Sequence, residues 1–239
     1  MLFHYVRHGD PIYDPDSLTP LGHRQAEAAG KRLALHGVDR VYASTSNRAI
    51  LTAKPTCELL RLGEPTLLDF ANECYAGQRL MVKTPEGVNT WPFYSHEHVM
   101  LFTTPEVRDL GHHWYDHPAF VERDFKSGIE ATYDEIDAFM LTLGYEHIRY
   151  TGRYRIVKPN RERVALFAHQ GFGILFLSCL LDIPYPEFCT RFDICHTGIT
   201  TIDFQEHGEF AIPKVLVHSS DAHLYKEGLP TKYNYGHTF

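Results

Sequence analysis

The sequence FHYVRHGD at residues 3–10 contains a short apolar run that ends at once in Arg7, His8 and Gly9. A run of this length bounded by glycine is typical of a buried strand. In an open α/β sheet, ligands bind in the crevice at the carboxyl ends of the strands. Arginine suits an oxyanion, and histidine can act as base, acid or nucleophile near neutral pH. Because many surface Arg-His pairs have no role, this triplet alone does not define a site.

The same order of features returns later in the chain. RVALFA at residues 163–168 is the clearest interior strand, and it ends in His169, Gln170 and Gly171. An apolar helix to about Leu181 follows. The two strand ends therefore predict two histidines, each with a glycine close behind, at one edge of a sheet.

Strands and helices alternate after the first strand. Thr19 is a good N-cap for a helix over about residues 20–35, and a short strand at 40–43 leads into a second helix over about 48–60. This order predicts a parallel sheet with crossover helices. Arg48 then lies in the first turn of a helix that follows a strand, near free backbone N–H groups that favour anions. On position alone, a solvated arginine is equally consistent.

The remaining segments are read from shorter patterns. A candidate strand at 65–70 runs into Glu73, which would reach the same crevice. We expect a loop at 10–17, a helix ending near Gly144, a strand or hairpin arm at 150–158, strands at 198–204 and 211–217, and no clear element from Ser220 onward. Residues 78 to about 127 show no dominant period and predict an insertion over the mouth of the crevice.

These elements predict an α/β fold with three α/β/α layers and a mostly parallel central sheet. We find no internal repeat and no low-complexity linker. We therefore expect a single domain over residues 1–239, with the insertion at about 78–127 above the active-site crevice.

The composition narrows the class of partner. The net charge of −7 argues weakly against nucleic acid or an anionic membrane as the main partner. The five cysteines show no Cys-x-x-Cys spacing, so we expect no disulfide framework and a cytoplasmic location. No signal peptide is evident, and the apolar stretch at 172–181 is too short to span a bilayer.

Histidine is abundant, with 16 residues in the chain. Several lie in the middle region, at His96, His98, His112, His113 and His117. Such a group could bind a metal, but no His-Glu-x-x-His or similar spacing appears, so surface or packing roles are favoured. A metal hydrolase built on these histidines stays open as an alternative.

Taken in order, the motifs resemble those of the histidine phosphatase superfamily, in its phosphoglycerate mutase-like branch. The resemblance covers most of the chain except the middle region. It rests on Arg7-His8-Gly9, Leu18-Thr19-x-x-Gly22 with Gln25-Ala26, Ser44-x-x-x-Arg48-Ala49-x-x-Thr52-Ala53, Asn72-Glu73, Ala168-His169-x-Gly171 and Ser220-Asp221-x-His223-Leu224.

The resemblance implies a reaction without metal ion or cofactor. His8 would be the nucleophile that accepts a phosphoryl group on one ring nitrogen, with the other nitrogen held by a backbone carbonyl. Glu73 would be the general acid that protonates the leaving oxygen and then the base that activates water. For Glu73, the plainer interpretation is an ordinary loop glutamate.

The resemblance also implies the phosphate-binding groups. Arg7, Arg48 and His169, the last as an imidazolium, would surround the phosphoryl group and stabilise charge on its oxygens. The backbone N–H of Gln170, at the start of a helix, would add a donor.

Two departures favour a phosphatase that hydrolyses a small phosphomonoester. In mutases of this family an asparagine several residues after Arg-His-Gly touches phosphate, whereas this chain has Asp14. The sequence after His169 also lacks the polar residues of the mutases. The alternatives are a phosphoglycerate mutase and a non-catalytic phosphate-binding regulatory domain. Tyr94, Trp114 and Tyr115 are expected to contact the leaving group, or else to pack the insertion onto the domain.

Overall fold

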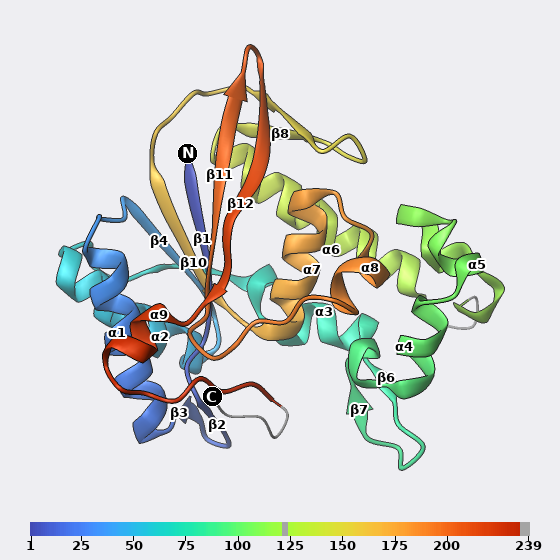
Figure 1. The fold of residues 1–239 in the computed structure, drawn as a ribbon, viewed down its shortest axis with the longest axis horizontal. Helices are drawn as coiled ribbons and strands as arrows, with labels where there is room; N and C mark the ends of the chain where they lie inside the picture. Colours follow the sequence, from blue (N-terminus) through green and yellow to red (C-terminus); the bar gives the residue numbers. More distant parts are fainter. Residues whose placement is uncertain (121–123, 235–239) are drawn as a thin grey trace.

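The computed structural model describes residues 1–120 and 124–234 (Figure 1). The strands are β1 (Leu2–Arg7), β2 (Pro11–Tyr13), β3 (Asp16–Leu18), β4 (Arg40–Ser44), β5 (Thr66–Leu68), β6 (Val82–Lys83), β7 (Asn89–Thr90), β8 (Tyr145–Ile148), β9 (Arg153–Ile156), β10 (Arg163–Ala168), β11 (Ile199–His207) and β12 (Phe210–Ser220). The helices are α1 (Pro20–Ala34), α2 (Asn47–Leu60), α3 (Glu73–Leu80), α4 (His96–Phe102), α5 (Pro105–Arg108), α6 (Phe125–Thr142), α7 (Gln170–Leu181), α8 (Tyr185–Cys189) and α9 (Ala222–Lys226).

The central sheet has the strand order β5-β4-β10-β1-β11-β12-β9-β8. The pairs β5/β4, β4/β10 and β10/β1 are parallel. The four pairs beyond β1 are antiparallel, so only β11 and β9 run against β1, and six of the eight strands (8 − 2) share its direction. The predicted α/β fold class with a mostly parallel central sheet is confirmed.

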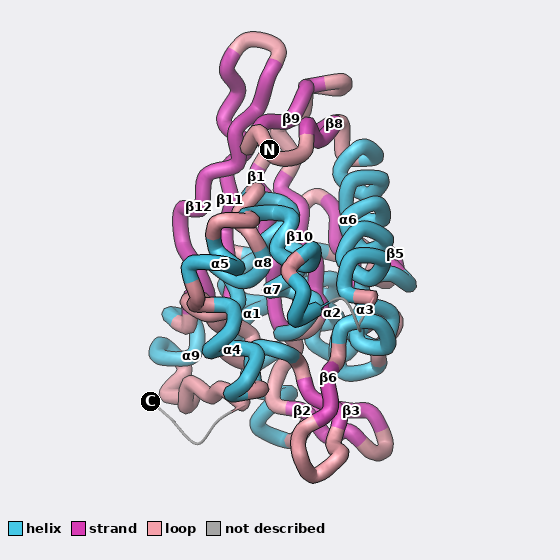
Figure 2. Tube along the Cα trace, turned by 90° about the vertical axis from the view of Figure 1, so that its right-hand side faces the viewer, coloured by secondary structure: helices cyan, strands magenta, loops and turns pink. Residues whose placement is uncertain are grey.

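Helices cover both faces of the sheet. Helices α1 and α2 lie on one face, and α3, α6 and α7 lie on the other (Figures 1 and 2). Strand β1 alternates between them, because Tyr5 packs in the core on the α7 side and Val6 packs in the core on the α2 side. A strand buried on both faces reads as an apolar run, which is why β1 and β10 were recognisable in the sequence.

The chain after β1 is held against the start of α1. Thr19 caps the helix by accepting a hydrogen bond from the Gly22 N–H at 3.0 Å. A β-carbon on Gly22 would collide with the carbonyl oxygen of Asp10, so this close approach requires glycine. The Thr19-x-x-Gly22 motif therefore fixes the loop that follows the Arg7-His8-Gly9 triplet.

Two local predictions are wrong. The expected loop at 10–17 contains the antiparallel pair β2/β3. The segment after Ser220, predicted to have no element, contains α9, whose Leu224 packs with Ala28 of α1 and Leu229. This short helix is stabilised by contacts with a distant helix, which the local sequence pattern does not reveal.

The middle region packs against the rest of the molecule. Its large aromatic residues belong to the same buried cluster as strands β1 and β10. Residues 121–123 of the predicted insertion and residues 235–239 of the predicted domain lie outside the described residues. The single domain with an insertion stays a prediction. Within residues 1–120 and 124–234, no helix has the length and apolar character needed to cross a bilayer.

Candidate active site

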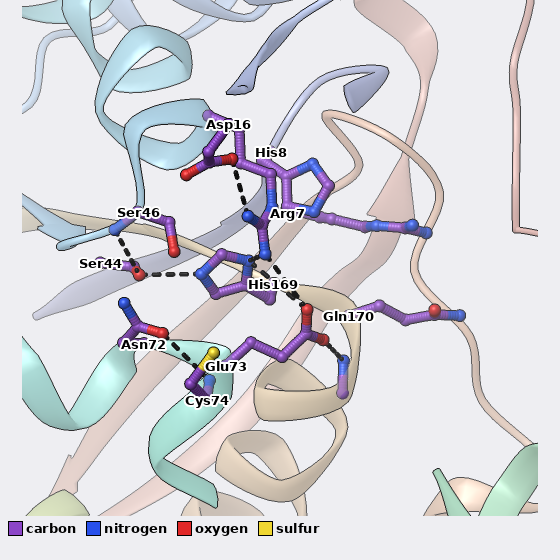
Figure 3. Close-up of polar contacts among 12 residues, drawn as sticks. Arg7, His8, Asp16, Ser44, Ser46, Asn72, Glu73, Cys74, His169 and Gln170 are labelled. Atoms are coloured by element: carbon purple, nitrogen blue, oxygen red, sulfur yellow. Dashed lines mark hydrogen bonds and ion pairs between the residues drawn. The ribbon is translucent and has the colours of Figure 1, made fainter. Parts of the chain in front are cut away.

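The register between β1 and β10 brings the two predicted histidines together. The strands pair from Leu2 with Arg163 through to Arg7 with Ala168, so His8 and His169 follow at the same level. The His8 N–H also donates to the Ala168 carbonyl at 2.8 Å. The two ring centroids lie 5.3 Å apart with the rings edge to face (Figure 3).

His8 is held in one tautomer. Its Nδ1 lies 2.7 Å from the carbonyl oxygen of Gly9, which can only accept, so Nδ1 carries the proton and Nε2 has a free lone pair. Burial, and then the electrostatic influence of His169, Arg7 and Arg48, lowers the pKa of His8 well below 6.5. The predicted hydrogen bond to a backbone carbonyl is confirmed, and His8 is a neutral imidazole.

His169 is also neutral in this structure. Arg48 Nη2 lies 3.1 Å from His169 Nδ1, and because a guanidinium only donates, Nε2 carries the proton that faces Ser44 Oγ at 2.8 Å. Burial, followed by Arg48 and Arg7, lowers the pKa of His169 well below 6.5. The imidazolium expected around a phosphoryl group stays a prediction, because the surrounding protein groups by themselves favour the neutral ring. The ring is buried among cations, and the Glu73 carboxylate lies 3.8 Å away.

Arg48 is fixed by carboxylates on two sides. Its Nη1 donates to Asp16 Oδ1 at 2.8 Å, and its Nη2 lies 3.3 Å from Glu73 Oε2. The other oxygen of Asp16 accepts the Asn47 N–H at 2.8 Å, at the first residue of α2. Asp16 therefore caps α2 and orients Arg48 at the same time. Sequence reasoning missed this role of Asp16.

Glu73 opens helix α3 on the other side of His169 from Ser44 (Figure 3). Asn72 caps this helix by accepting the Cys74 N–H at 3.0 Å, which gives the Asn72-Glu73 motif its structural reason. Glu73 Oε1 accepts the Gly171 N–H at 3.2 Å, at the start of α7. The carboxylate is thus fixed between two helix starts, and its side chain retains 20% exposure.

The side chains of Arg7 and Gln170 extend in the same direction, away from Ser44 (Figure 3). Arg7 is fully buried, and its Nη1 donates to the Ile194 carbonyl at 2.6 Å. The Gln170 side chain accepts from the Tyr94 hydroxyl at 2.6 Å and donates to Asp193. Because its side chain is engaged in this way, the group that Gln170 offers a ligand is its backbone N–H at the start of α7.

The six predicted site residues therefore gather around one point. Arg7, His8, Arg48, Glu73, His169 and Gln170 come from the ends of β1 and β10 and the starts of α2, α3 and α7. The structure adds Ser44, Asp16, His196 and Asn234 to their surroundings. Each of these four is distant in sequence from the residue it contacts. Ser44 belongs to the motif that contains Arg48, whereas no spacing signal identified the other three.

His196 stacks on His8, with ring centroids 5.9 Å apart. Its Nδ1 lies 3.4 Å from Asp10 Oδ1. Burial, and then Arg7, lower the pKa of His196 to about 3. A third neutral imidazole therefore packs against the ring of His8.

Of the three aromatic residues expected to contact the leaving group, the structure places one beside the site. Tyr94 reaches the site through its contact with Gln170. Trp114 instead packs in the core between Phe102 and Phe120, and Tyr115 is buried with its hydroxyl facing Glu130 at 3.3 Å. These two aromatic residues anchor the middle region.

The clustered histidines do not form a metal site. No three of His96, His98, His112, His113 and His117 come together in the part of the chain that the structure describes. A group with metal-binding residue types lies elsewhere, at Asp137, His147 and Cys179. There Arg149 donates to Asp137 Oδ2 at 2.5 Å, which places a positive charge where a metal would bind.

A cavity of about 270 Å³ opens beside Arg48 and Glu73. It is lined further by Cys74, Gly77, Gln78, Met81 and Asn89. Helix α3 and the strand pair β6/β7 supply these walls. The carboxylate of Glu73 thus lies between His169 and a space that can hold a small group.

The N-terminal part of the chain matches a known family. The sequence profile of the histidine phosphatase superfamily (branch 1) matches residues 5–98, which include Arg7, His8, Arg48 and Glu73. The resemblance drawn from the motifs is confirmed by this match to the family. No curated protein matches the sequence.

Solved phosphatases share the fold. Phosphoserine phosphatase from Entamoeba histolytica is 18% identical, with 93% of this chain and 98% of that chain covered and a TM-score of 0.58. Mycobacterial glucosyl-3-phosphoglycerate phosphatase is 16% identical over 92% and 99%, with a TM-score of 0.58. Alpha-ribazole phosphatase from Shigella flexneri is 20% identical over 90% and 96%, with a TM-score of 0.53. Each of these likenesses covers at least 90% of this chain.

Proposed function

We propose that this protein is a metal-independent phosphatase that hydrolyses a small phosphomonoester through a phosphohistidine on His8. The observation that carries the proposal is the neutral His8 ring, whose Nδ1 is bound to the Gly9 carbonyl and whose Nε2 therefore keeps its lone pair. An imidazole nitrogen with a free lone pair is a nucleophile. Two guanidiniums and a carboxylate beside it supply the other groups that phosphoryl transfer needs.

In the first step, His8 Nε2 forms a bond to phosphorus while the bond from phosphorus to the leaving oxygen breaks. Glu73, in its protonated form, gives its proton to that oxygen. Arg7 and Arg48 stabilise the negative charge on the three remaining phosphoryl oxygens. A bound dianion also favours the protonated form of His169, so the imidazolium expected from the sequence belongs to the occupied site.

In the second step, water attacks the phosphorus of phospho-His8. The Glu73 carboxylate takes a proton from this water, the bond between phosphorus and Nε2 breaks, and inorganic phosphate leaves. His8 returns to the neutral tautomer held by Gly9, and Glu73 is again protonated for the next cycle.

The cavity beside Glu73 is the space for the leaving group. Arg48 is the one cation among its lining residues in the described part of the chain, and Asp16 and Glu73 already pair with it. A leaving group with its own carboxylate would find no free cation there. This favours a neutral leaving group, and hence phosphatase activity over phosphoglycerate mutase activity. Supplying 3-phosphoglycerate separates the two, since a mutase returns 2-phosphoglycerate and a phosphatase releases inorganic phosphate.

The chemistry is tested with His8→Ala on a panel of phosphomonoesters. We expect turnover to fall by at least about 1000-fold, because the nucleophile is lost. The parent protein should form an acid-labile phosphoryl-enzyme that the variant cannot form, and turnover should survive EDTA. Unchanged turnover by His8→Ala would contradict the proposal. No turnover by the parent, with phosphate still bound, would indicate a non-catalytic phosphate-binding domain.

We also propose a cytoplasmic location. Cys57, Cys74, Cys179, Cys189 and Cys195 are all unpaired, and all but Cys74 are buried. Unpaired buried thiols are expected in a reducing compartment.

A further inference from the structure

Asn234 lies at the mouth of the phosphate pocket. Its side-chain oxygen accepts a hydrogen bond from Arg7 Nη2. Its side-chain nitrogen donates to Gln170 Oε1 at 2.8 Å. Arg7 and Gln170 are two of the groups assigned above to phosphate binding. Asn234 therefore bridges this side of the pocket, although it is 227 positions from Arg7.

The residues before Asn234 are anchored by contacts with three distant parts of the chain. Thr231 donates to Asp221 Oδ2 at 2.6 Å, and the Lys232 carbonyl accepts the His196 N–H at 2.9 Å. Lys232 Nζ also lies 3.6 Å from Asp10 Oδ1. Residues 231–234, here called the C-terminal arm, therefore run beside the ring of His196, which stacks on His8.

An amide suits this position better than a carboxylate. In the empty pocket its oxygen accepts from Arg7 without neutralising the guanidinium charge, so the attraction for an anion is kept. A phosphoryl oxygen binds a guanidinium more strongly than a neutral amide oxygen does, and displaces it. The same side chain can then turn its NH₂ group toward the anion, because an amide carries both a donor and an acceptor.

We propose that Asn234 is a phosphate-pocket residue, which accepts from Arg7 in the empty site and donates to a phosphoryl oxygen in the occupied site. This inference rests on the proposed phosphatase function. Asn234, in the C-terminal arm, would supply the neutral amide that is missing after the Arg7-His8-Gly9 triplet. Asp14, which stands at that earlier position, is exposed in the turn between β2 and β3 and reaches no group of the pocket among the described residues.

The test compares Asn234→Asp, Asn234→Ala and Asn234→Gln with Gln205→Glu. The aspartate has nearly the shape of the asparagine but would pair with Arg7 and repel phosphate. Gln205→Glu adds the same charge on β11, away from the pocket, and serves as the control. The inhibition constant of inorganic phosphate is measured together with KM and kcat for one phosphomonoester, and melting temperatures establish that each variant is folded.

We expect Asn234→Asp to raise the phosphate inhibition constant and KM by about 10-fold to 100-fold, and Asn234→Ala by a few-fold. Asn234→Gln should recover part of the loss, and Gln205→Glu should match the parent. If Asn234→Asp and Asn234→Ala both stay within about twofold of the parent, the inference is wrong. Tighter phosphate binding by Asn234→Ala would also contradict it, because Asn234 would then only block the pocket.

The two proposals fail separately. His8→Ala tests the phosphohistidine reaction and leaves Asn234 unchanged. If His8→Ala loses turnover and Asn234→Asp does not weaken phosphate binding, the phosphatase proposal stands and only the role of Asn234 is rejected. If His8→Ala keeps full turnover, the phosphatase proposal fails whatever the Asn234 variants do.

Discussion

Two groups of buried histidine in this molecule have neighbours of opposite charge. At the phosphate pocket, His8 and His169 lie among guanidinium groups, and burial followed by these cations lowers the pKa of both. At the other end of α7, His147 lies between two carboxylates, with Nδ1 2.8 Å from Asp137 and Nε2 3.2 Å from Asp182. Burial alone would lower the pKa of His147, but the hydrogen bonds that the ring donates to these carboxylates outweigh it and raise the pKa.

The comparison shows that burial does not decide what a histidine does. With arginine neighbours the imidazole stays neutral and keeps a lone pair for chemistry. With carboxylate neighbours the imidazolium is favoured and both nitrogens are used as donors, which joins β8 to α6 and to the end of α7. Asp182 also accepts the backbone N–H of Gly152 at 2.7 Å, so this second group stabilises the β8/β9 hairpin.

The largest effect is expected from removing proton transfer at the pocket. Glu73→Gln keeps an acceptor for the Gly171 N–H but cannot exchange protons. We expect kcat for alkyl phosphates to fall by about 10²-fold to 10⁴-fold. With p-nitrophenyl phosphate, whose leaving group needs no proton, a burst of p-nitrophenol equal to the enzyme concentration should precede slow turnover. Glu135→Gln, an exposed neighbour that faces Tyr75, is the control and should behave as the parent. Equal losses without a burst would count against Glu73 as the acid.

The next largest effect is expected on the free energy of unfolding, when His147 is replaced. His147→Gln leaves Asp137 and Asp182 without their shared cation, and we expect a loss of about 3 kcal/mol in the free energy of unfolding. Because the pKa of His147 is raised, its contribution is fully present below pH 6.5 and is lost as pH rises through the folded-state pKa. Urea denaturation at pH 6 and pH 9 measures this, with exposed His207→Gln as control. A difference between variant and parent that grows with pH would contradict the assignment.

A smaller effect is expected in the pH profile of the pocket. Because the pKa of His8 is lowered, its nucleophilic form persists as pH falls below 6.5. At pH 5.5 a histidine with an ordinary pKa would be about 90% protonated, and activity would fall about 10-fold. We expect kcat/KM, corrected for ionisation of the substrate, to be nearly unchanged there. An acid limb centred at pH 6.5 or above would show that the pocket does not hold His8 neutral.

The smallest effect is expected from Asp16, which orients one of the guanidiniums. Asp16→Asn keeps the shape but removes the charge that faces Arg48 Nη1 at 2.8 Å. We expect kcat/KM to fall by about 3-fold to 10-fold, since Arg48 keeps its contact with Glu73. Asp14→Asn, two residues earlier and exposed, is the matched control. A loss of kcat/KM of the same size in both variants would show that Asp16 has no specific role in orienting Arg48.

The sequence allowed prediction of the elements whose pattern is local. β1, β10 and α7 are buried on all sides, so their apolar runs were visible, and Thr19 marked the start of α1. His8, His169 and Gln170 could be singled out because they directly follow β1 and β10, whereas the roles of Arg48 and Glu73 came from the resemblance to the family. The fold class was predictable from the alternation of strands and helices.

The rest depends on contacts between distant residues. Asn234 and Asp16 are surface-type polar residues until the fold places them beside Arg7 and Arg48. Trp114 was expected at the pocket but fills the core, because an aromatic residue in a segment without periodicity gives no sign of the face it will pack against. Helix α9 forms against α1, which no local pattern encodes.

The register of β1 against β10 has a consequence for how this protein can change over evolution. Each pair of opposed residues in the two strands lies at one level along the sheet. His8 and His169 lie one residue beyond the last pair, Arg7 and Ala168. Loops elsewhere can lengthen without altering the distance between the two rings. One residue inserted or deleted within either strand would turn the ring to the opposite face of the sheet. The pairing of these strands therefore fixes the relative position of the two reacting rings. We expect insertions and deletions to accumulate outside residues 2–8 and 163–169.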